Sequence, residues 1–219
     1  MREDEHTPAL SVQRAGGGAG AAVMLSCVVL LAASALGALV LGPLSRTAMP
    51  QPGDPEAPAY LAGHIGAIYL VAASQLVAAA ALYVYGAYVP HAVRSVRRVR
   101  MALLVGVGVL VLAAVAGFAL AVVAPVSDDA AIHVLHTVAW LSGGELHVAT
   151  LGLYVAWLAR SLLWSPMLRV TGALAGWCAV GALVVLVAPA LGPFGVAARL
   201  LCLVWLLIAA HQSAFRDVA

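Results

Sequence analysis

One long apolar stretch of this chain, residues 131–160, contains several ionisable residues, whereas the other long apolar stretches contain almost none. The stretch holds His133, His136 and His147, three of the chain's seven histidines, together with Glu145. A charged group at the centre of a bilayer costs about 2.5–3.5 kcal/mol on insertion scales, so such a residue usually marks a functional site. Glu145 is therefore predicted to bind a ligand or a proton. The alternative is a protonated Glu145 that hydrogen-bonds to a neighbouring helix.

Depth in the membrane divides the polar residues into two levels. If residues 131–160 cross from outside to inside, Glu145 and His147 fall near the midplane. Gln75 falls at the same level of another apolar stretch, residues 59–89. These three residues form the predicted site for a small ligand or a proton.

The second level lies near the outer interface and contains His64, His133 and His136. Imidazole is a good ligand for zinc, copper and iron, and histidines on facing helices can hold haem. These histidines are therefore candidates for a metal or haem site, and the alternative is hydrogen bonding to loops or lipid headgroups. Because no CxxC or HExxH motif accompanies them, the favoured prediction is a protein without a cofactor.

Helical phase separates Glu145 from the histidines. Residues three or four apart share a helix face, and eleven residues make about three turns. His133, His136 and His147 therefore form one stripe, while Glu145 points elsewhere. A bend at Ser142-Gly143-Gly144, where small residues can interrupt a helix, would change this relation.

Composition decides the class of protein. Of 219 residues, 64% are hydrophobic and 9% are charged, against about 25% charged in soluble domains. Several continuous apolar runs are long enough for membrane helices, which need roughly 20 residues. The sequence predicts an all-α, polytopic integral membrane protein. A net charge of +2 gives no reason to expect nucleic-acid binding.

Breaks in the apolar pattern divide the chain into six transmembrane helices in a bundle. Prolines, glycines and charged residues separate them. A polar, glycine-rich cytoplasmic tail, predicted to be disordered, covers residues 1–20, and a short cytoplasmic tail covers 214–219. The membrane domain, residues 21–213, contains helices at about 21–44, 59–89, 101–124, 131–160, 170–191 and 194–213.

The distribution of the arginines predicts which side of the membrane each loop and terminus lies on. Cytoplasmic loops of membrane proteins carry an excess of basic residues. With six crossings and both termini in the cytoplasm, the outside segments hold only Arg46 and Arg199. The inside segments hold the other nine arginines: Arg2, Arg14, Arg94, Arg97, Arg98, Arg100, Arg160, Arg169 and Arg216.

Two arginine features invite a closer interpretation. Arg94, Arg97, Arg98 and Arg100 form a cationic patch, which either binds anionic lipid headgroups or only fixes the topology. Arg199 lies on the outer side near the start of the last helix. Its charge is expected to reach the interface, or to pair with an acidic residue among Glu56, Asp128 and Asp129.

The second half of the chain resembles a known family. In residues 145–176, Leu146-His147 precedes an apolar run, and Arg160-Ser161, Pro166, Gly172 and Gly176 follow. This region is similar to the six-helix bacterial membrane proteins grouped as domain of unknown function 4386. The resemblance covers about the fourth and fifth helices. It implies a six-helix integral membrane protein without an assigned activity, and it supports His147 as a site residue.

The sequence thus favours a non-enzymatic, multi-pass plasma-membrane protein of a bacterium with a GC-rich genome. Its partners are the lipid bilayer and either further copies of itself or another membrane subunit. Three functions stay open: small-ligand or proton binding in an intramembrane polar patch, metal or haem redox chemistry, and a role as an accessory subunit of a membrane complex.

Overall fold

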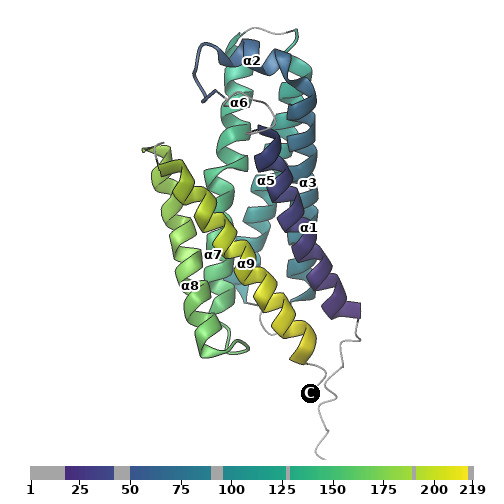
Figure 1. Ribbon diagram of the computed structural model, residues 1–219, viewed down its shortest axis with the longest axis vertical. Helices are drawn as coiled ribbons and strands as arrows, with labels where there is room; N and C mark the ends of the chain where they lie inside the picture. Colours follow the sequence, from purple (N-terminus) through teal and green to yellow (C-terminus); the bar gives the residue numbers. More distant parts are fainter. Residues whose placement is uncertain (1–17, 42–49, 90–95, 127–128, 189–190, 217–219) are drawn as a thin grey trace, which may run out of the picture.

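The structure, a computed structural model, describes residues 18–41, 50–89, 96–126, 129–188 and 191–216. Every regular element in these ranges is a helix, which confirms the all-α class (Figure 1). In chain order the helices are α1 (Gly18–Leu41), α2 (Ala57–Gly63), α3 (Ile65–Tyr88), α5 (Arg97–Val123), α6 (Asp129–Gly143), α7 (Glu145–Ala159), α8 (Pro166–Gly181), the 3₁₀ helix η2 (Ala182–Leu186) and α9 (Gly192–Arg216).

The helices run along the long axis of the molecule in two groups. Helices α1, α3 and α5 pack side by side in one group, and α7, α8 and α9 form the other. Helix α6 stands on top of α7 in Figure 1 but packs against α5, so the α6–α7 segment passes from one group to the other. Figure 1 also shows the start of α1 and the end of α9 at the same end of the molecule.

Within the described residues, four helical segments are long and apolar enough to cross a membrane: residues Ile65–Tyr88, Arg97–Val123, Pro166–Leu186 and Gly192–Ser213. They identify the chain as a membrane protein. The first and fourth predicted transmembrane helices, residues 21–44 and 131–160, are not among these four segments. The described apolar part of α1 covers Ala21–Gly37, and α6 and α7 have 15 residues each. A 15-residue helix is about 22 Å long, shorter than a hydrocarbon core of about 30 Å.

The second predicted helix, residues 59–89, is divided in two at His64. Its side chain explains the interruption, because Nδ1 lies 2.7 Å from the carbonyl oxygen of Tyr60. In a regular helix that carbonyl would accept the backbone N–H of His64. Here that N–H donates to Leu61 instead, and the imidazole ring stacks on Tyr60.

Other helix ends differ from the predicted ones by a few residues. The fifth helix starts at Pro166 instead of residue 170, because Ser165 accepts a hydrogen bond from the Leu168 N–H and proline suits the first turn. It tightens into η2 after Gly181. The third helix begins at Arg97, four residues before the predicted start, and Arg97, Arg98 and Arg100 are exposed in its first turn.

The predicted tails are shorter than expected where they can be compared. Helix α1 already begins at Gly18, inside the tail predicted to end at residue 20. Helix α9 continues to Arg216, three residues into the predicted C-terminal tail. No proline or glycine interrupts it there, and the Ser213 hydroxyl donates back to Ala209. Residues 1–17 and 217–219 lie outside the described residues.

The two groups of helices meet at buried tyrosines. The Tyr85 hydroxyl of α3 donates to the Leu206 carbonyl of α9 over 3.2 Å. The same ring meets Tyr154 of α7 edge to face, with the centroids 6.4 Å apart. Both tyrosines are almost completely buried, so these contacts fix α7 and α9 relative to α3.

Candidate functional site

The α6–α7 segment is broken at Gly144, midway along residues 131–160, the apolar stretch that contains three of the histidines and Glu145. Helix α6 ends at Gly143 and α7 begins at Glu145, at the bend that Ser142-Gly143-Gly144 predicted. Broken membrane helices leave backbone groups free, and proteins tolerate them where they line a cavity. The break therefore indicates a site between the two groups of helices.

The two glycines at the break have a steric role. A Cβ atom on Gly144 would lie 2.7 Å from the Trp140 carbonyl oxygen, which is too close for any larger residue. A Cβ atom on Gly143 would collide with the side-chain amide of Gln75 on α3. The glycines thus permit the break and let Gln75 pack directly against it.

A cavity of about 240 Å³ lies beside the break. Helices α1, α3, α5, α6 and α9 surround it together with Glu145 at the start of α7. Its polar wall comes from four helices and Glu145, whereas its apolar wall comes mainly from α3, α5 and α6. The polar lining residues are Ser34, Ser74, Gln75, His136, Glu145 and Arg199; the larger apolar ones are Ile68, Val71, Leu120 and Trp140.

Opposite charges face each other in this cavity. The Glu145 carboxylate lies over Gly195 of α9, where a Cβ atom would be only 2.9 Å from Oε2. Arg199 follows one helical turn later on the same face, and the charges of Glu145 and Arg199 interact. Arg199 Nη2 also donates to the Ser34 hydroxyl of α1 over 3.4 Å.

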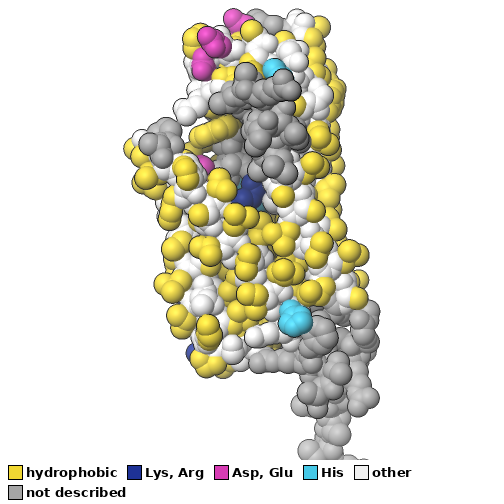
Figure 2. All heavy atoms as spheres, viewed as in Figure 1, with side chains coloured by type: hydrophobic (Ala, Val, Ile, Leu, Met, Phe, Trp, Pro, Cys, Tyr) yellow, Lys and Arg dark blue, Asp and Glu magenta, His cyan; other side chains and the backbone are white. Residues whose placement is uncertain are grey.

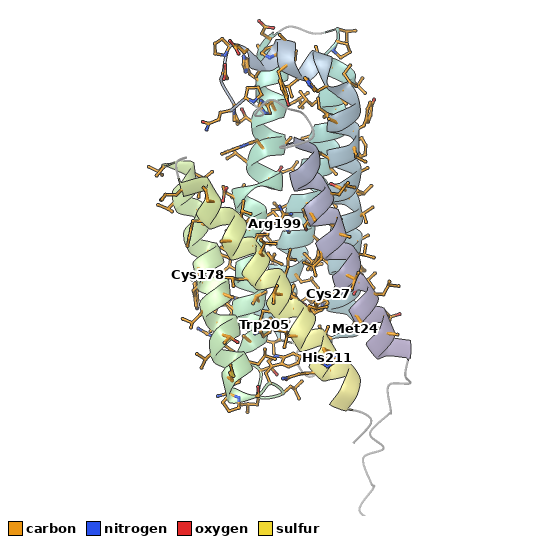
Figure 3. The ribbon with its side chains drawn as sticks, in the orientation of Figure 1. Met24, Cys27, Cys178, Arg199, Trp205 and His211 are labelled. Carbon is orange, nitrogen blue, oxygen red and sulfur yellow. The ribbon has the colours of Figure 1, made fainter. Side chains whose placement is uncertain are left out.

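Figure 3 labels Arg199 near the middle of the molecule, where α9 passes α1. In the same orientation, Figure 2 shows a basic side chain at this level, surrounded by apolar side chains. Such a position is unusual for a guanidinium, because taking a charge out of water is costly unless a partner compensates it. Glu145 supplies that compensation.

Several polar atoms of the site are buried without a hydrogen-bond partner. They include Oε2 of Glu145 and Nε of Arg199, one acceptor and one donor. Both ring nitrogens of His136 are in the same situation, and His136 is completely buried. Buried polar groups are nearly always satisfied by protein, water or a ligand. These atoms therefore have unused capacity to hold a bound molecule.

The structure groups the predicted site residues differently from the two expected levels. Gln75 and Glu145 do lie together, as expected for the midplane group. His136, expected at the outer level, joins them because the break at Gly144 reorients α6 relative to α7. His147 is outside the lining of the cavity. It is completely buried, with both ring nitrogens unpartnered, and it interacts electrostatically with Arg199.

The other candidate metal ligands stay apart from the cavity. His64 sits at the α2–α3 break, where Nδ1 must carry the proton because the Tyr60 carbonyl can only accept. His133 lies half-buried on α6. Within the described ranges, no three His, Cys, Asp or Glu side chains are arranged to hold a metal ion. A haem or metal site at His64, His133 and His136 stays a prediction.

The cationic patch lies at the start of α5. Arg97, Arg98 and Arg100 are exposed there, and Arg94 falls outside the described residues. Arg98 packs over the ring of Trp157 at the end of α7. The cationic patch of α5 therefore contacts a second helix, α7. The spacing of the arginines along the sequence could not reveal this contact.

Sequence reasoning missed Arg199 as a site residue. It was expected at the outer interface, or paired with Glu56, Asp128 or Asp129. The structure places it in the cavity with Glu145 instead, and Asp128 falls outside the described residues. One signal was available, since Arg199 lies inside the apolar run of residues 194–213, six residues past Pro193 of the Gly192-Pro193 break.

Comparison of the chain with protein families, characterised proteins and solved structures gave no match. The resemblance of residues 145–176 to domain of unknown function 4386 stays a prediction.

Proposed function

We propose that this chain is a six-pass plasma-membrane protein that binds a small zwitterionic ligand in the cavity between Glu145 and Arg199. Six crossings are supported by the alternating directions of α1, α3, α5, α6–α7, α8 and α9 (Figure 1). The start of α1 and the end of α9 lie at the same end of the molecule, as an even number of crossings requires. The arginine distribution favours the cytoplasmic side for that end.

One observation carries the choice of ligand. Glu145 and Arg199 line the same cavity, and each has a buried polar atom without a hydrogen-bond partner. A ligand with an ammonium group and a carboxylate group would satisfy both atoms at once. Charge-assisted hydrogen bonds of this kind are roughly twice as strong as neutral ones.

The walls of the cavity restrict the size and character of the ligand. A volume of about 240 Å³ is below the range of about 300–1,000 Å³ typical of sites for drug-sized molecules. Ile68, Val71 and Leu120 offer an apolar surface next to the charged groups. The ligand is therefore a small molecule with a short apolar part.

Proton binding at the same site is the second candidate function. It is favoured by His136, which lines the cavity with Glu145 and has both ring nitrogens unpartnered. Carboxyl and imidazole groups in membrane segments commonly form proton relays. In this second reading, ligand binding and protonation compete for Glu145.

A thermal-shift panel tests the proposed ligand class. Purified protein in detergent is mixed with glycine, alanine or betaine as zwitterions, and with acetate or methylamine as single charges. Ligand binding stabilises the folded state by mass action, by about 2.7 kcal/mol at 100 times Kd. We expect zwitterions to raise the melting temperature more than either single charge does.

The Arg199→Gln variant is the critical comparison in this panel, and Arg169→Gln is its matched control on α8. Arg199→Gln should lose the response to zwitterions, whereas Arg169→Gln should keep it. If acetate and methylamine stabilise the protein as strongly as glycine, or if Arg199→Gln responds normally, the zwitterion proposal is wrong.

A further inference from the structure

A second cluster of side chains lies far from the cavity, where α5 begins and α7 ends. The described acidic side chains other than Glu145 are Asp54, Glu56 and Asp129, and they lie around α2 and the start of α6. Figure 2 shows a group of acidic side chains at the upper end of the molecule, with another acidic side chain lower down. The start of α5 and the end of α7 lie toward the opposite end in Figure 1, so their arginines are away from these carboxylates: Arg97, Arg98, Arg100 and Arg160.

Trp157 organises this basic cluster. The guanidinium carbon of Arg160 lies 4.2 Å from the centroid of the Trp157 ring, and that of Arg98 lies 5.0 Å from it. Both distances are within the ~6 Å range of a cation–π interaction. One half-buried indole therefore holds two exposed cations, one from the start of α5 and one from the end of α7.

The two guanidinium groups carry like charges near one ring, and a nearby anion would reduce their mutual repulsion. No described carboxylate is placed to neutralise them, and the first turn of α5 contains no acidic residue. A guanidinium presents its N–H donors in a planar fork that matches phosphate oxygens. Each of the two arginines can therefore donate to phosphate oxygens beside the Trp157 ring.

Neighbouring residues indicate where that phosphate comes from. Met101, Leu104 and Val105 follow on α5 and are exposed by 43–51% of their surface. They belong to a segment that is apolar and long enough to span a membrane, so the arginines lie at its edge. Tryptophan is also enriched at that depth. A lipid can place its headgroup on the arginines and its acyl chain on this apolar surface, which a free phosphate ion cannot use.

We propose that Arg98 and Arg160, held on Trp157, bind the phosphate of an anionic phospholipid headgroup. This site is independent of the cavity between Glu145 and Arg199. It joins the cationic patch of α5 to the end of α7, and so couples the two groups of helices at this end of the molecule.

Native mass spectrometry of the purified, delipidated protein tests this proposal. The probes are phosphatidylglycerol, phosphatidylcholine and inorganic phosphate, and the variants are Arg98→Gln, Arg160→Gln and the pair combined. Each basic residue near an anionic headgroup contributes about fivefold in affinity. We expect phosphatidylglycerol binding to fall about fivefold in each single variant and about 25-fold in the double variant.

Matched variants separate a specific site from a general effect of charge. Arg169→Gln removes an arginine of α8 that does not touch Trp157, and it should leave binding within about twofold of the unchanged protein. Trp157→Leu keeps all the charges but removes the ring, and it should weaken phosphatidylglycerol binding. Lysine at positions 98 and 160 keeps the charge without the fork and should bind with intermediate affinity.

Three results would overturn the proposal. The first is equal binding of phosphatidylcholine and phosphatidylglycerol. The second is an Arg169→Gln variant that loses as much affinity as Arg98→Gln, which would leave only net charge as the cause. The third is displacement of phosphatidylglycerol by equimolar inorganic phosphate, which would assign the site to a free anion.

Discussion

Replacing Glu145 with glutamine is expected to weaken zwitterion binding about 10–100-fold while the protein stays folded. Glutamine keeps the shape of the side chain but removes the charge that faces the ligand's ammonium group. Hydrogen bonds to charged groups contribute about 1.5–3 kcal/mol, and each 1.4 kcal/mol corresponds to a factor of ten. Isothermal titration of the purified protein with glycine or alanine measures the change.

Asp129→Asn is the matched control for this prediction. Asp129 is an exposed acidic residue in the first turn of α6, and it does not line the cavity. Its replacement removes the same charge from the adjoining helix and should leave the dissociation constant unchanged. Equal affinities of the Glu145→Gln variant and the unchanged protein would remove Glu145 from the binding site.

The second large effect is expected at the contact between α7 and α8. A Cβ atom on Gly176 would lie 2.5 Å from the Gly152 carbonyl oxygen and 2.7 Å from the Ala156 Cβ atom. Both neighbours are rigid parts of α7. Overpacking of this kind costs about 1–3 kcal/mol, so Gly176→Ala should lower the melting temperature by roughly 2–12 °C.

Helix propensity predicts the opposite sign for this substitution, which makes the test informative. Alanine is about 1 kcal/mol better than glycine inside a helix. Gly108 of α5 has open space around its Cβ position, so Gly108→Ala serves as the control and should not lower the melting temperature. If Gly176→Ala is as stable as Gly108→Ala, then α7 and α8 do not approach as closely as described.

The sequence predicted the features that depend on local patterning. Continuous apolar runs predicted an all-helical membrane protein, and small residues at Ser142-Gly143-Gly144 predicted the bend. Glu145 stood out because a carboxylate is costly in an apolar run, and the structure places it in a cavity. These inferences need only the neighbours of each residue along the chain.

The remaining features depend on how helices rotate against each other. Arg199 faces Glu145 because Gly195, one turn earlier on α9, lets the carboxylate approach the backbone. His136 joins the site because the break at Gly144 reorients α6. The predicted faces of residues 131–160 assumed one continuous helix, so they did not contain this change. The break at His64 arises from a hydrogen bond between its side chain and the Tyr60 carbonyl. This bond takes the place of a backbone hydrogen bond of the helix, which the residue types alone do not reveal.

A double-mutant cycle on Glu145 and Arg199 tests most directly that these two charges face one cavity. Melting temperatures and unfolding free energies are measured for the unchanged protein, Glu145→Gln, Arg199→Gln and the combined variant. Each single replacement leaves the other charge uncompensated, whereas the double replacement removes both. We therefore predict a coupling energy of about 0.5–3 kcal/mol, with the double variant more stable than the sum of the single effects implies. Effects that add to within about 0.3–0.5 kcal/mol would contradict the account, because residues without a shared environment behave in that way.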